Sequence, residues 1–198
     1  LAVVPDERIA TAAEFQRRLA AILAAHAEDT EPLLFDGCYE MLEVLGIGGK
    51  AEVHRAYHHD ALRYVALKLL SEESCANPDE RRRFACEARA LAAVSHPSLP
   101  TLVDCRTGMK RRRPFIAMSL ARGRAAGDFM LPTTRLPPEI VITVGEQVGG
   151  ALAAMHARGI LHRDLHGSNV LVNLHERTVN ATLIDVGMAG FTDRFYAK

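Results

Sequence analysis

The chain has 198 residues, of which 48% are hydrophobic, with 24 basic and 24 acidic side chains and a pI near 7.3. This length suits one domain or two small lobes around a cleft, and the apolar share is enough to build a core. The balanced charge does not indicate a nucleic-acid partner, and because no run of about 18 uncharged apolar residues is present, we expect no membrane-spanning segment.

Residues 1–35 are expected to form an N-terminal helical extension. Thr11 and Glu14 have the spacing of a capping box. An apolar stripe at helical spacing follows, formed by Phe15, Leu19, Ile22 and Leu23. The extension is interpreted either as a helix that packs on the next region or serves as a linker, or as a regulatory segment that touches a cleft. The sequence leaves these alternatives open.

Residues 36–120 have the pattern of a β-rich lobe with one long helix. Short apolar runs, broken by glycine and polar pairs, predict antiparallel strands at 40–45, 51–57, 63–70, 101–107 and 114–120. Before the fourth strand, Asn77 as the cap, Pro78 at the first helical position and Glu80 at the third predict a helix. This helix should run to about Val94. The basic turn at 110–113 is expected to be solvated rather than to dock an acidic partner.

Residues 121–198 begin with a hinge and loop rich in glycine and proline, which extend to Pro138. A long helix from Pro138 to near Gly159 is predicted by an apolar stripe formed by Ile140, Val144, Val148, Leu152 and Met155. Short strands are predicted at 170–173 and 182–184. Together with the strands upstream, these elements indicate an α+β fold.

One loop carries the most informative chemistry, because the run from Leu161 to Asn169 reads Leu-His-Arg-Asp-Leu-His-Gly-Ser-Asn. Asp164 and Asn169 can face one phosphate-transfer centre, where the Asp accepts a hydroxyl proton and the Asn binds a metal ion. Further along the chain, Asp185 ends an apolar run. That is the expected place for a second metal ligand.

Two upstream motifs have the chemistry of phosphate binding. Gly46, Gly48 and Gly49 lie between two predicted strands, where glycines let the backbone approach phosphates and offer amide N–H donors. Lys68 ends the apolar run Val-Ala-Leu-Lys. A buried ammonium at that position is costly without partners.

Taken together, the four motifs resemble the protein kinase family over about residues 39–191, most closely the bacterial-type Ser/Thr kinases. The resemblance implies a protein-kinase-like bilobal fold, with a five-stranded antiparallel N-lobe (36–120) and a partial helical C-lobe (121–198). It also implies ATP as phosphate donor, Mg²⁺ as metal ion, and a protein with a Ser or Thr hydroxyl as substrate.

The same resemblance implies roles for particular residues. Asp164 would accept or orient the substrate hydroxyl, while Asn169 and Asp185 would hold Mg²⁺. Lys68 would contact the α- and β-phosphates and be oriented by Glu87; Glu80 is the alternative partner, but its place at the helix cap explains it better. The nucleotide would be bound by Leu45, Gly46, Gly48, Gly49, Val53, Ala66, Lys68, Met118, Leu120 and Leu171.

Several positions depart from the family pattern. Ala51 replaces the third glycine, which should leave the turn possible. His166 stands where Ser/Thr kinases usually have a catalytic lysine. The absence of that lysine could cost about 2–4 kcal/mol of transition-state stabilisation. Val186 replaces a Phe, with Leu91 as its expected contact. The chain ends soon afterwards, so we read it as a piece of a kinase and expect one side of the helix at 138–158 to be exposed.

Three functions are compatible with these motifs. The leading interpretation is transfer of the ATP γ-phosphate to a Ser or Thr hydroxyl of a protein by the full-length parent, of which this chain would carry a partial catalytic domain. The second is a small-molecule phosphotransferase, because Asp164-Leu165-His166 resembles the Asp-Leu-His of aminoglycoside phosphotransferases. The third is a non-catalytic, nucleotide-binding pseudokinase, which His166 and Val186 favour and which the retained Lys68, Asp164, Asn169 and Asp185 oppose.

The cysteines give an expectation about cellular compartment. Cys38, Cys75, Cys86 and Cys105 lie at wide, irregular spacings, and no C-x-x-C pair is present. This pattern favours reduced cysteines in the cytoplasm, and the spacing predicts no zinc site.

Overall fold

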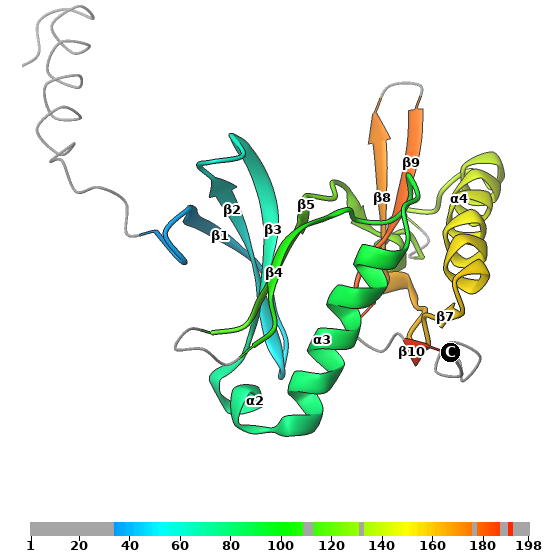
Figure 1. Cartoon of the computed structure of the whole chain (residues 1–198). Helices are drawn as coiled ribbons and strands as arrows, with labels where there is room; N and C mark the ends of the chain where they lie inside the picture. The colour runs from blue at the N-terminus through cyan, green and yellow to red at the C-terminus, as the bar shows by residue number, and fades with distance from the viewer. Residues whose placement is uncertain (1–33, 109–112, 131–132, 176–177, 187–189, 192–198) are drawn as a thin grey trace, which may run out of the picture. The chain divides into compact units, whose positions relative to one another are not determined.

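The structure is a computed structural model that describes residues 34–108, 113–130, 133–175, 178–186 and 190–191 (Figure 1). The chain divides into two compact units, Leu1–Leu34 and Phe35–Lys198. The fold and the site below belong to the second unit. The helix expected within 1–35 lies outside the described residues, as does most of the basic turn at 110–113. The lobe boundary between residues 120 and 121 stays a prediction.

Five strands form one antiparallel sheet in the order β1-β2-β3-β5-β4, which confirms the predicted N-lobe architecture. They are β1 (Tyr39–Ile47), β2 (Ala51–His58), β3 (Arg63–Leu70), β4 (Leu102–Arg106) and β5 (Phe115–Ser119). The central strand β3 is largely buried, because it has a neighbour on each edge and packed side chains on both faces. Its register places Lys68 opposite Val53 on one side and Ile116 on the other.

The long helix of this lobe, α3 (Pro78–Ala93), starts as the capping pattern predicts. The Asn77 side chain accepts hydrogen bonds from the backbone N–H groups of Asp79, at 2.9 Å, and Glu80, at 3.4 Å. A short helix that we did not predict, α2 (Glu72–Ala76), precedes it. Ser71 caps α2 by accepting from the Ser74 N–H at 3.1 Å. A helix this short leaves no apolar periodicity for sequence analysis to detect.

The second half of the unit contains one long helix and several short elements. They are β6 (Arg124–Ala125), the 3₁₀ helix η2 (Ala126–Phe129), α4 (Pro138–Ala157), β7 (Ile160–Leu161), the 3₁₀ helix η3 (Gly167–Asn169), β8 (Val170–His175), β9 (Thr178–Leu183) and β10 (Gly190–Phe191). Strands β6, β8 and β9 form one small sheet, and β7 pairs with β10.

The prediction of a short strand at 182–184 was wrong in its bounds. The strand β9 begins at Thr178, because it forms a hairpin with β8 in which His175 faces Thr178 and Val170 faces Leu183. Ile184 lies beyond the strand, and its N–H donates instead to the Asn169 carbonyl at 2.7 Å. Cross-strand pairing, rather than local apolarity, sets both ends of this strand.

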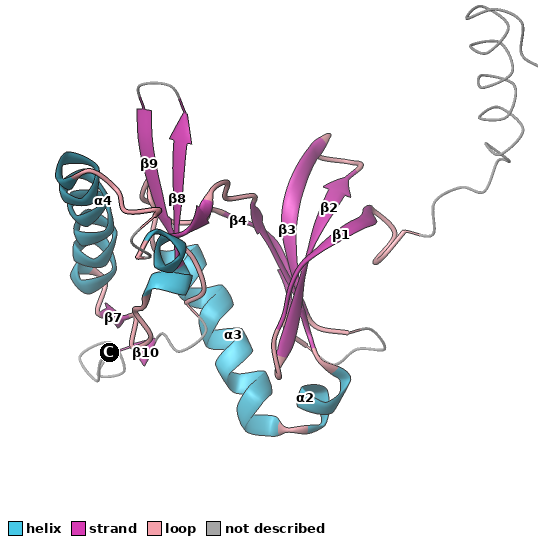
Figure 2. Cartoon of the chain, turned by 180° about the vertical axis from the view of Figure 1, so that it is seen from behind, coloured by secondary structure: helices cyan, strands magenta, loops and turns pink. Residues whose placement is uncertain are grey.

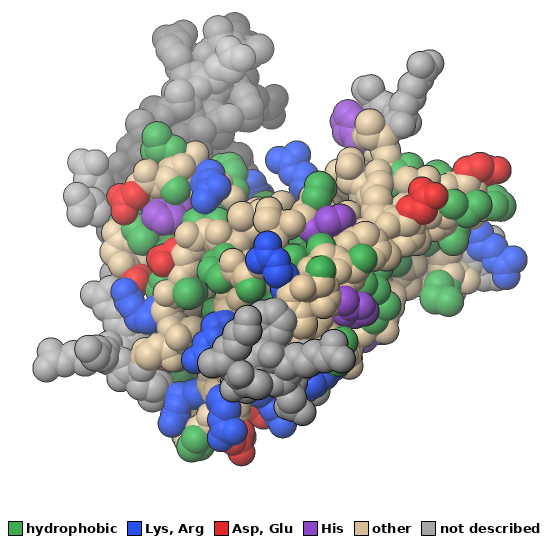
Figure 3. All heavy atoms as spheres, turned by 45° about the vertical axis from the view of Figure 1, so that its right-hand side comes forward, with side chains coloured by type: hydrophobic (Ala, Val, Ile, Leu, Met, Phe, Trp, Pro, Cys, Tyr) green, Lys and Arg blue, Asp and Glu red, His purple; other side chains and the backbone are tan. Residues whose placement is uncertain are grey.

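Helix α4 packs against β9 (Figure 2) and buries Val148, Ala151 and Met155. Val141 and Ile142, on other sides of the helix, are exposed, which agrees with the expectation of an exposed side. Figure 3 is turned so that the α4 side of the molecule comes forward, and it shows apolar side chains among charged ones and histidines. Among the described residues, α4 alone is long and apolar enough to cross a membrane, by length and composition only. Core helices of soluble proteins have the same composition.

A continuous apolar core connects the sheet to the helical half. It runs from Ala66 and Leu70 on β3 through α3 to α4, β8 and β9. The position of Gly123, between β5 and β6, requires a glycine. Its φ is +126°, and a Cβ there would lie 2.5 Å from the Val172 carbonyl oxygen. The core therefore fixes the distance between the strand that holds Lys68 and the loops that follow α4.

Candidate active site

A buried ion pair links the sheet to α3. The Lys68 Nζ donates to both carboxylate oxygens of Glu87, at 2.7 and 2.9 Å, and the two side chains are only 12% and 3% exposed. Burial by itself lowers the pKa of the Lys68 ammonium, but Glu87 and Asp185 outweigh that effect and raise it. Lys68 is therefore charged, and the pairing implied by the family resemblance is present.

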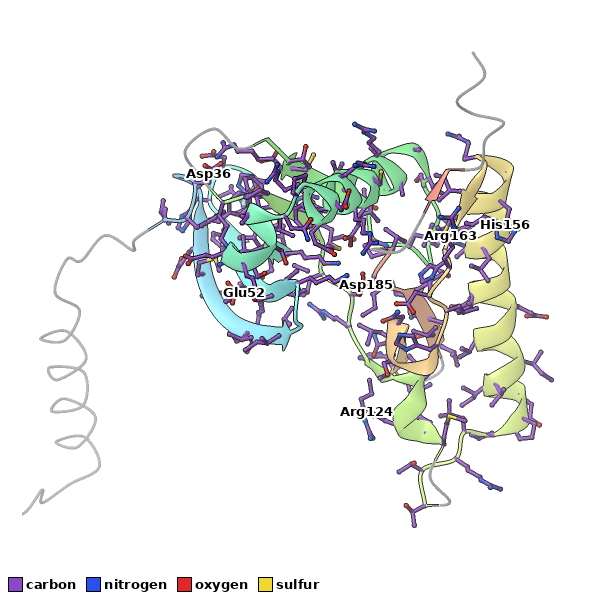
Figure 4. All side chains as sticks on the ribbon, turned by 90° about the horizontal axis from the view of Figure 1, so that it is seen from below. Asp36, Glu52, Arg124, His156, Arg163 and Asp185 are labelled. Carbon is purple, nitrogen blue, oxygen red and sulfur yellow. The ribbon has the colours of Figure 1, made fainter. Side chains whose placement is uncertain are left out.

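Asp185 joins this pair from the other half of the unit. Its Oδ1 accepts from the Lys68 Nζ at 2.9 Å, and its side chain is 45% exposed. Figure 4 shows Asp185 between the sheet and the α4 half. The φ of Asp185 is +58°, a conformation that costs a non-glycine residue roughly 1 kcal/mol or more. The backbone is thus held in an unfavourable conformation at the residue that presents a carboxylate to Lys68.

Asp164 and Asn169 lie together in the loop after β7. The Asn169 side-chain nitrogen donates to the Asp164 carbonyl at 2.9 Å and to its Oδ2 at 3.4 Å. Asn169 is 8% exposed, and the Ile184 N–H donates to its carbonyl. The loop and the segment that ends in Asp185 are therefore joined by backbone hydrogen bonding, which brings the three polar residues to one place.

His162 is a buried residue of this loop that hydrogen-bonds to the loop backbone. It is 3% exposed, and its Nδ1 accepts from the Asp164 N–H at 3.3 Å. Burial lowers the pKa of the His162 imidazole, although the Ile184 backbone and the Asp164 and Asp185 carboxylates oppose this. A neutral ring with Nδ1 as acceptor fits that hydrogen bond.

His166 lies beside Asp164 but is less tightly held. Its Nε2 is 3.8 Å from the Asp164 Oδ2, and the two side chains are 49% and 44% exposed. Its Nδ1 accepts from the Ser168 N–H at 3.3 Å and caps η3. Because Nδ1 is the acceptor, the neutral ring carries its proton on Nε2, on the side of the carboxylate.

Two adjoining cavities contain nearly all the predicted site residues. The first, of about 720 Å³, is lined by the glycine-rich loop and by charged residues that include Lys68, Glu87, Asp164, Asn169 and Asp185. The second, of about 370 Å³, is more apolar, and its lining includes Leu45, Val53, Ala66, Met118, Leu120 and Leu171. Volumes of this size suit a small ligand. Of the predicted residues, His166 is the one that lines neither cavity.

The glycine-rich loop lines the first cavity. The Gly48 N–H donates to the Ala51 carbonyl at 2.9 Å, so the turn forms although Ala51 replaces a glycine. A Cβ added at Gly46 or Gly49 would meet no nearby atom, and a Cβ added at Gly48 would lie 3.4 Å from the Ala51 carbonyl oxygen. The glycines therefore leave open space beside the cavity rather than relieve a backbone clash.

Three charged residues of this cavity were not predicted as site residues. Lys50, in the glycine-rich loop, lies 3.0 Å from the Glu80 carboxylate, and Arg83 contacts the same carboxylate at 3.1 Å. Glu80 thus binds two cations beside the cavity, as well as occupying the first turn of α3. The Lys50 position within the loop was a usable signal, whereas Arg83 is identified only by the orientation of α3.

Val186, which departs from the family pattern, is buried in the core. Val186 is 2% exposed and belongs to the same apolar cluster as Leu91, which is 6% exposed. Both side chains are thus buried in one core, and the direct contact expected between them stays a prediction. A valine fills less volume than a phenylalanine, so the contact area is smaller.

The donor atoms near Asp185 suit a hard divalent cation. Asn169 and Asp185 offer amide and carboxylate oxygens, which Mg²⁺ prefers. Both side chains line the two cavities, close to the ammonium of Lys68. The residues present therefore fit a divalent metal ion, which Asn169 and Asp185 would hold.

Comparison with known proteins identifies the family. The protein kinase domain family matches residues 39–196. The serine/threonine-protein kinase pkn2 of Myxococcus xanthus is 34% identical over 159 residues, covering 80% of this chain and 19% of that protein. PknL of Mycobacterium tuberculosis is 31% identical over 150 residues, covering 76% of this chain and 37% of that protein.

A solved structure agrees with the sequence relatives. The crystal structure of the Mycobacterium tuberculosis PknI kinase domain aligns with a TM-score of 0.65 and 31% identity, covering 80% of this chain and 63% of that one. The chain spans less than two fifths of the length of the two curated relatives named above. Its site geometry, its matched family and these bacterial relatives agree, and the chain belongs to the protein kinase family, with a domain of the bacterial Ser/Thr kinase type.

Proposed function

We propose that the protein transfers the γ-phosphate of ATP to a Ser or Thr hydroxyl of a protein substrate, with Mg²⁺ as its metal ion. The observation that carries this proposal is the convergence of Lys68, Asp164, Asn169 and Asp185 on one cavity. Lys68 comes from β3, Asp164 from the loop before η3, Asn169 from η3 itself and Asp185 from the segment after β9. They are the polar groups that phosphoryl transfer requires.

Each residue has a defined task in this proposal. Lys68 neutralises phosphate charge, and Glu87 keeps its ammonium in place through two hydrogen bonds. Asn169 and Asp185 would hold Mg²⁺, which supplies positive charge to the phosphate oxygens. The apolar second cavity suits the adenine ring.

Asp164 would act on the hydroxyl nucleophile. The hydroxyl oxygen forms a bond to the γ-phosphorus, the bond from that phosphorus to the bridging oxygen breaks, and ADP leaves. The hydroxyl proton passes to the Asp164 carboxylate. Since an ordinary carboxylate is a weak base, orientation of the hydroxyl contributes more than proton abstraction.

The named relatives favour a protein as the acceptor over a small molecule, because they are Ser/Thr-protein kinases. The Asp-Leu-His run at 164–166 is the feature that the small-molecule alternative rests on, and the structure places His166 outside both cavities. For compartment, we propose the cytoplasm, where ATP is available and the four free cysteines can stay reduced.

The test separates transfer from binding. Asp164→Asn should reduce phosphate transfer to a Ser/Thr-containing test protein by about 100-fold or more, while the Mg²⁺-ATP-dependent rise in melting temperature persists. Asp128→Asn, at a half-exposed carboxylate outside both cavities, is the matched control and should retain transfer. Equal transfer by wild type and Asp164→Asn would reject the catalytic role. ATP binding without any transfer by wild type would favour the pseudokinase alternative.

A further inference from the structure

A second group of metal-binding side chains lies outside the nucleotide site. Cys38, His58 and Asp60 each offer one ligand atom, and these atoms all lie within 4.8 Å of one another. Cys38 and His58 are half-buried, whereas Asp60 is exposed. Cys38 directly precedes β1, His58 ends β2, and Asp60 lies in the turn that follows β2. A thiol, an imidazole and a carboxylate form a typical mixed ligand set for a transition metal.

The sheet holds two of these ligands in place. Tyr39 pairs with His58 in the β1–β2 register, and the His59 N–H extends this ladder by donating to the Cys38 carbonyl at 2.9 Å. The His58 ring packs against the Tyr39 ring, with centroids 4.6 Å apart, and Tyr39 is fully buried. Cys38 and His58 are therefore positioned by backbone pairing and by a rigid aromatic neighbour, as preorganised metal ligands are.

The charges around Cys38 favour a cation. Burial raises the pKa of the Cys38 thiol, and the carboxylates of Asp60, Asp36 and Asp104 raise it further, against a smaller opposing effect of Arg106. Arg106 is itself ion-paired with Asp36. Three carboxylates with one nearby guanidinium leave a net negative potential at the thiol. A divalent cation would relieve that potential and deprotonate the thiol by coordination.

The cysteine spacing alone predicts no zinc site, but it does not register a cluster of one cysteine with a histidine and an aspartate. We propose that Cys38, His58 and Asp60 bind one Zn²⁺ ion. Sulfur and nitrogen ligands disfavour Mg²⁺ and Ca²⁺, which take oxygen ligands, and favour a borderline metal such as zinc. Ligand atoms around a tetrahedral zinc ion lie roughly 3.3–3.6 Å apart, so side-chain movements of about 1 Å bring the three ligand atoms, now within 4.8 Å of one another, to that geometry. Three protein ligands leave the fourth position to water.

This site is separate from the nucleotide site. Cys38 and His58 lie at the end of the β1–β2 hairpin opposite the glycine-rich turn at 47–51. Figure 4 shows Asp36, two residues from Cys38, well apart from Asp185. A bound ion would join the start of β1 to the β2–β3 turn, so it should stabilise the sheet without taking part in phosphate transfer.

The test is titration of the untagged chain with Co²⁺, a spectroscopic substitute for Zn²⁺, followed by displacement with Zn²⁺. We expect one thiolate-bound ion per chain, a thiolate-to-cobalt charge-transfer band in the near ultraviolet and the intense visible bands of tetrahedral cobalt. Cys38→Ser should abolish the charge-transfer band, and His58→Ala should weaken zinc binding about 100-fold or more. Asp60→Asn, at an exposed position, should weaken it at least about tenfold.

Two control variants identify the site. Cys105→Ser removes an exposed thiol elsewhere on the sheet, and Asp185→Asn removes a carboxylate of the nucleotide site. Both should bind Co²⁺ like wild type at the Cys38 site. Absence of a thiolate band in wild type, a band that survives Cys38→Ser, or zinc binding that is lost in Asp185→Asn but kept in Asp60→Asn would each overturn the proposal.

Discussion

The Lys68–Glu87 pair and the Asp164–His166 pair lie at the same candidate site but in different surroundings. The first pair has N–O distances of 2.7 and 2.9 Å and side chains 12% and 3% exposed. The second has an N–O distance of 3.8 Å, with side chains 49% and 44% exposed. Charges interact strongly where water is excluded and weakly where it is present. Loss of the first pair should therefore lower both phosphate transfer and the stability of the fold. A change in the second pair should alter phosphate transfer alone.

The largest expected effect comes from breaking the buried pair. Lys68→Met leaves the Glu87 carboxylate buried without its cation, which should destabilise the fold by about 3–5 kcal/mol. For a unit of this size, the melting temperature should fall by roughly 6–20 °C, and phosphate transfer should be lost as well. Differential scanning calorimetry measures the first effect, and a transfer assay measures the second.

The matched control for that variant is Arg82→Met. Arg82 pairs with Asp79 at 2.9 Å, but the two side chains are 76% and 69% exposed, so its loss should leave the melting temperature unchanged. If Lys68→Met and Arg82→Met melt at the same temperature, burial does not distinguish the two kinds of pair, and the comparison fails.

An intermediate effect is expected at the exposed pair. His166→Lys places a permanent positive charge beside Asp164, at the position where the family usually has lysine. Phosphate transfer at pH 7 should rise about tenfold or more, since one such contact can contribute 2–4 kcal/mol. The melting temperature should change little, because the ring is half-exposed. His175→Lys, at an exposed strand end, is the control. Unchanged or lower transfer in His166→Lys would show that this position does not face the transferred phosphate.

The smallest expected effect concerns pH. His162 has a pKa lowered from its ordinary value of 6.5 by burial, so the unfolded chain binds a proton more readily than the folded one. Its contribution to stability is complete above pH 6.5 and is lost as the pH falls from 6.5 toward the folded-state value. His162→Gln should remove this part of the pH dependence. Melting temperatures of the wild type and of His162→Gln, measured between pH 5 and 8, should differ by an amount that grows toward neutral pH. Parallel curves of melting temperature against pH would contradict this prediction.

Much of the architecture was predictable because its signals are local. The helix cap at Asn77 and the continuous apolar run of β3 depend on residues near each other in the chain. The bounds of β3 were predicted to the residue. The strand β9 was not, because its ends depend on pairing with β8. The helix α2 was missed because it is too short to show periodicity.

The candidate site was predictable in its residues but not in its contacts. The motif spacing identified Lys68, Asp164, Asn169 and Asp185, and the structure brings them to one cavity. The roles assigned to these residues stay predictions. Lys50 and Arg83, which share the Glu80 carboxylate beside that cavity, were missed as site residues because their contact depends on how α3 is oriented against the glycine-rich loop.

The sequence by itself determined the family, the order of the strands along the chain and the side chains available for phosphate chemistry. Each of these follows from residue types and short spacings, which do not depend on packing. The tertiary structure decided the hydrogen bond between Lys68 and Asp185, 117 residues apart, and the cluster of Cys38, His58 and Asp60. Contacts of this kind form only when the core fixes the distance between elements, because no local rule relates residues so far apart in the chain.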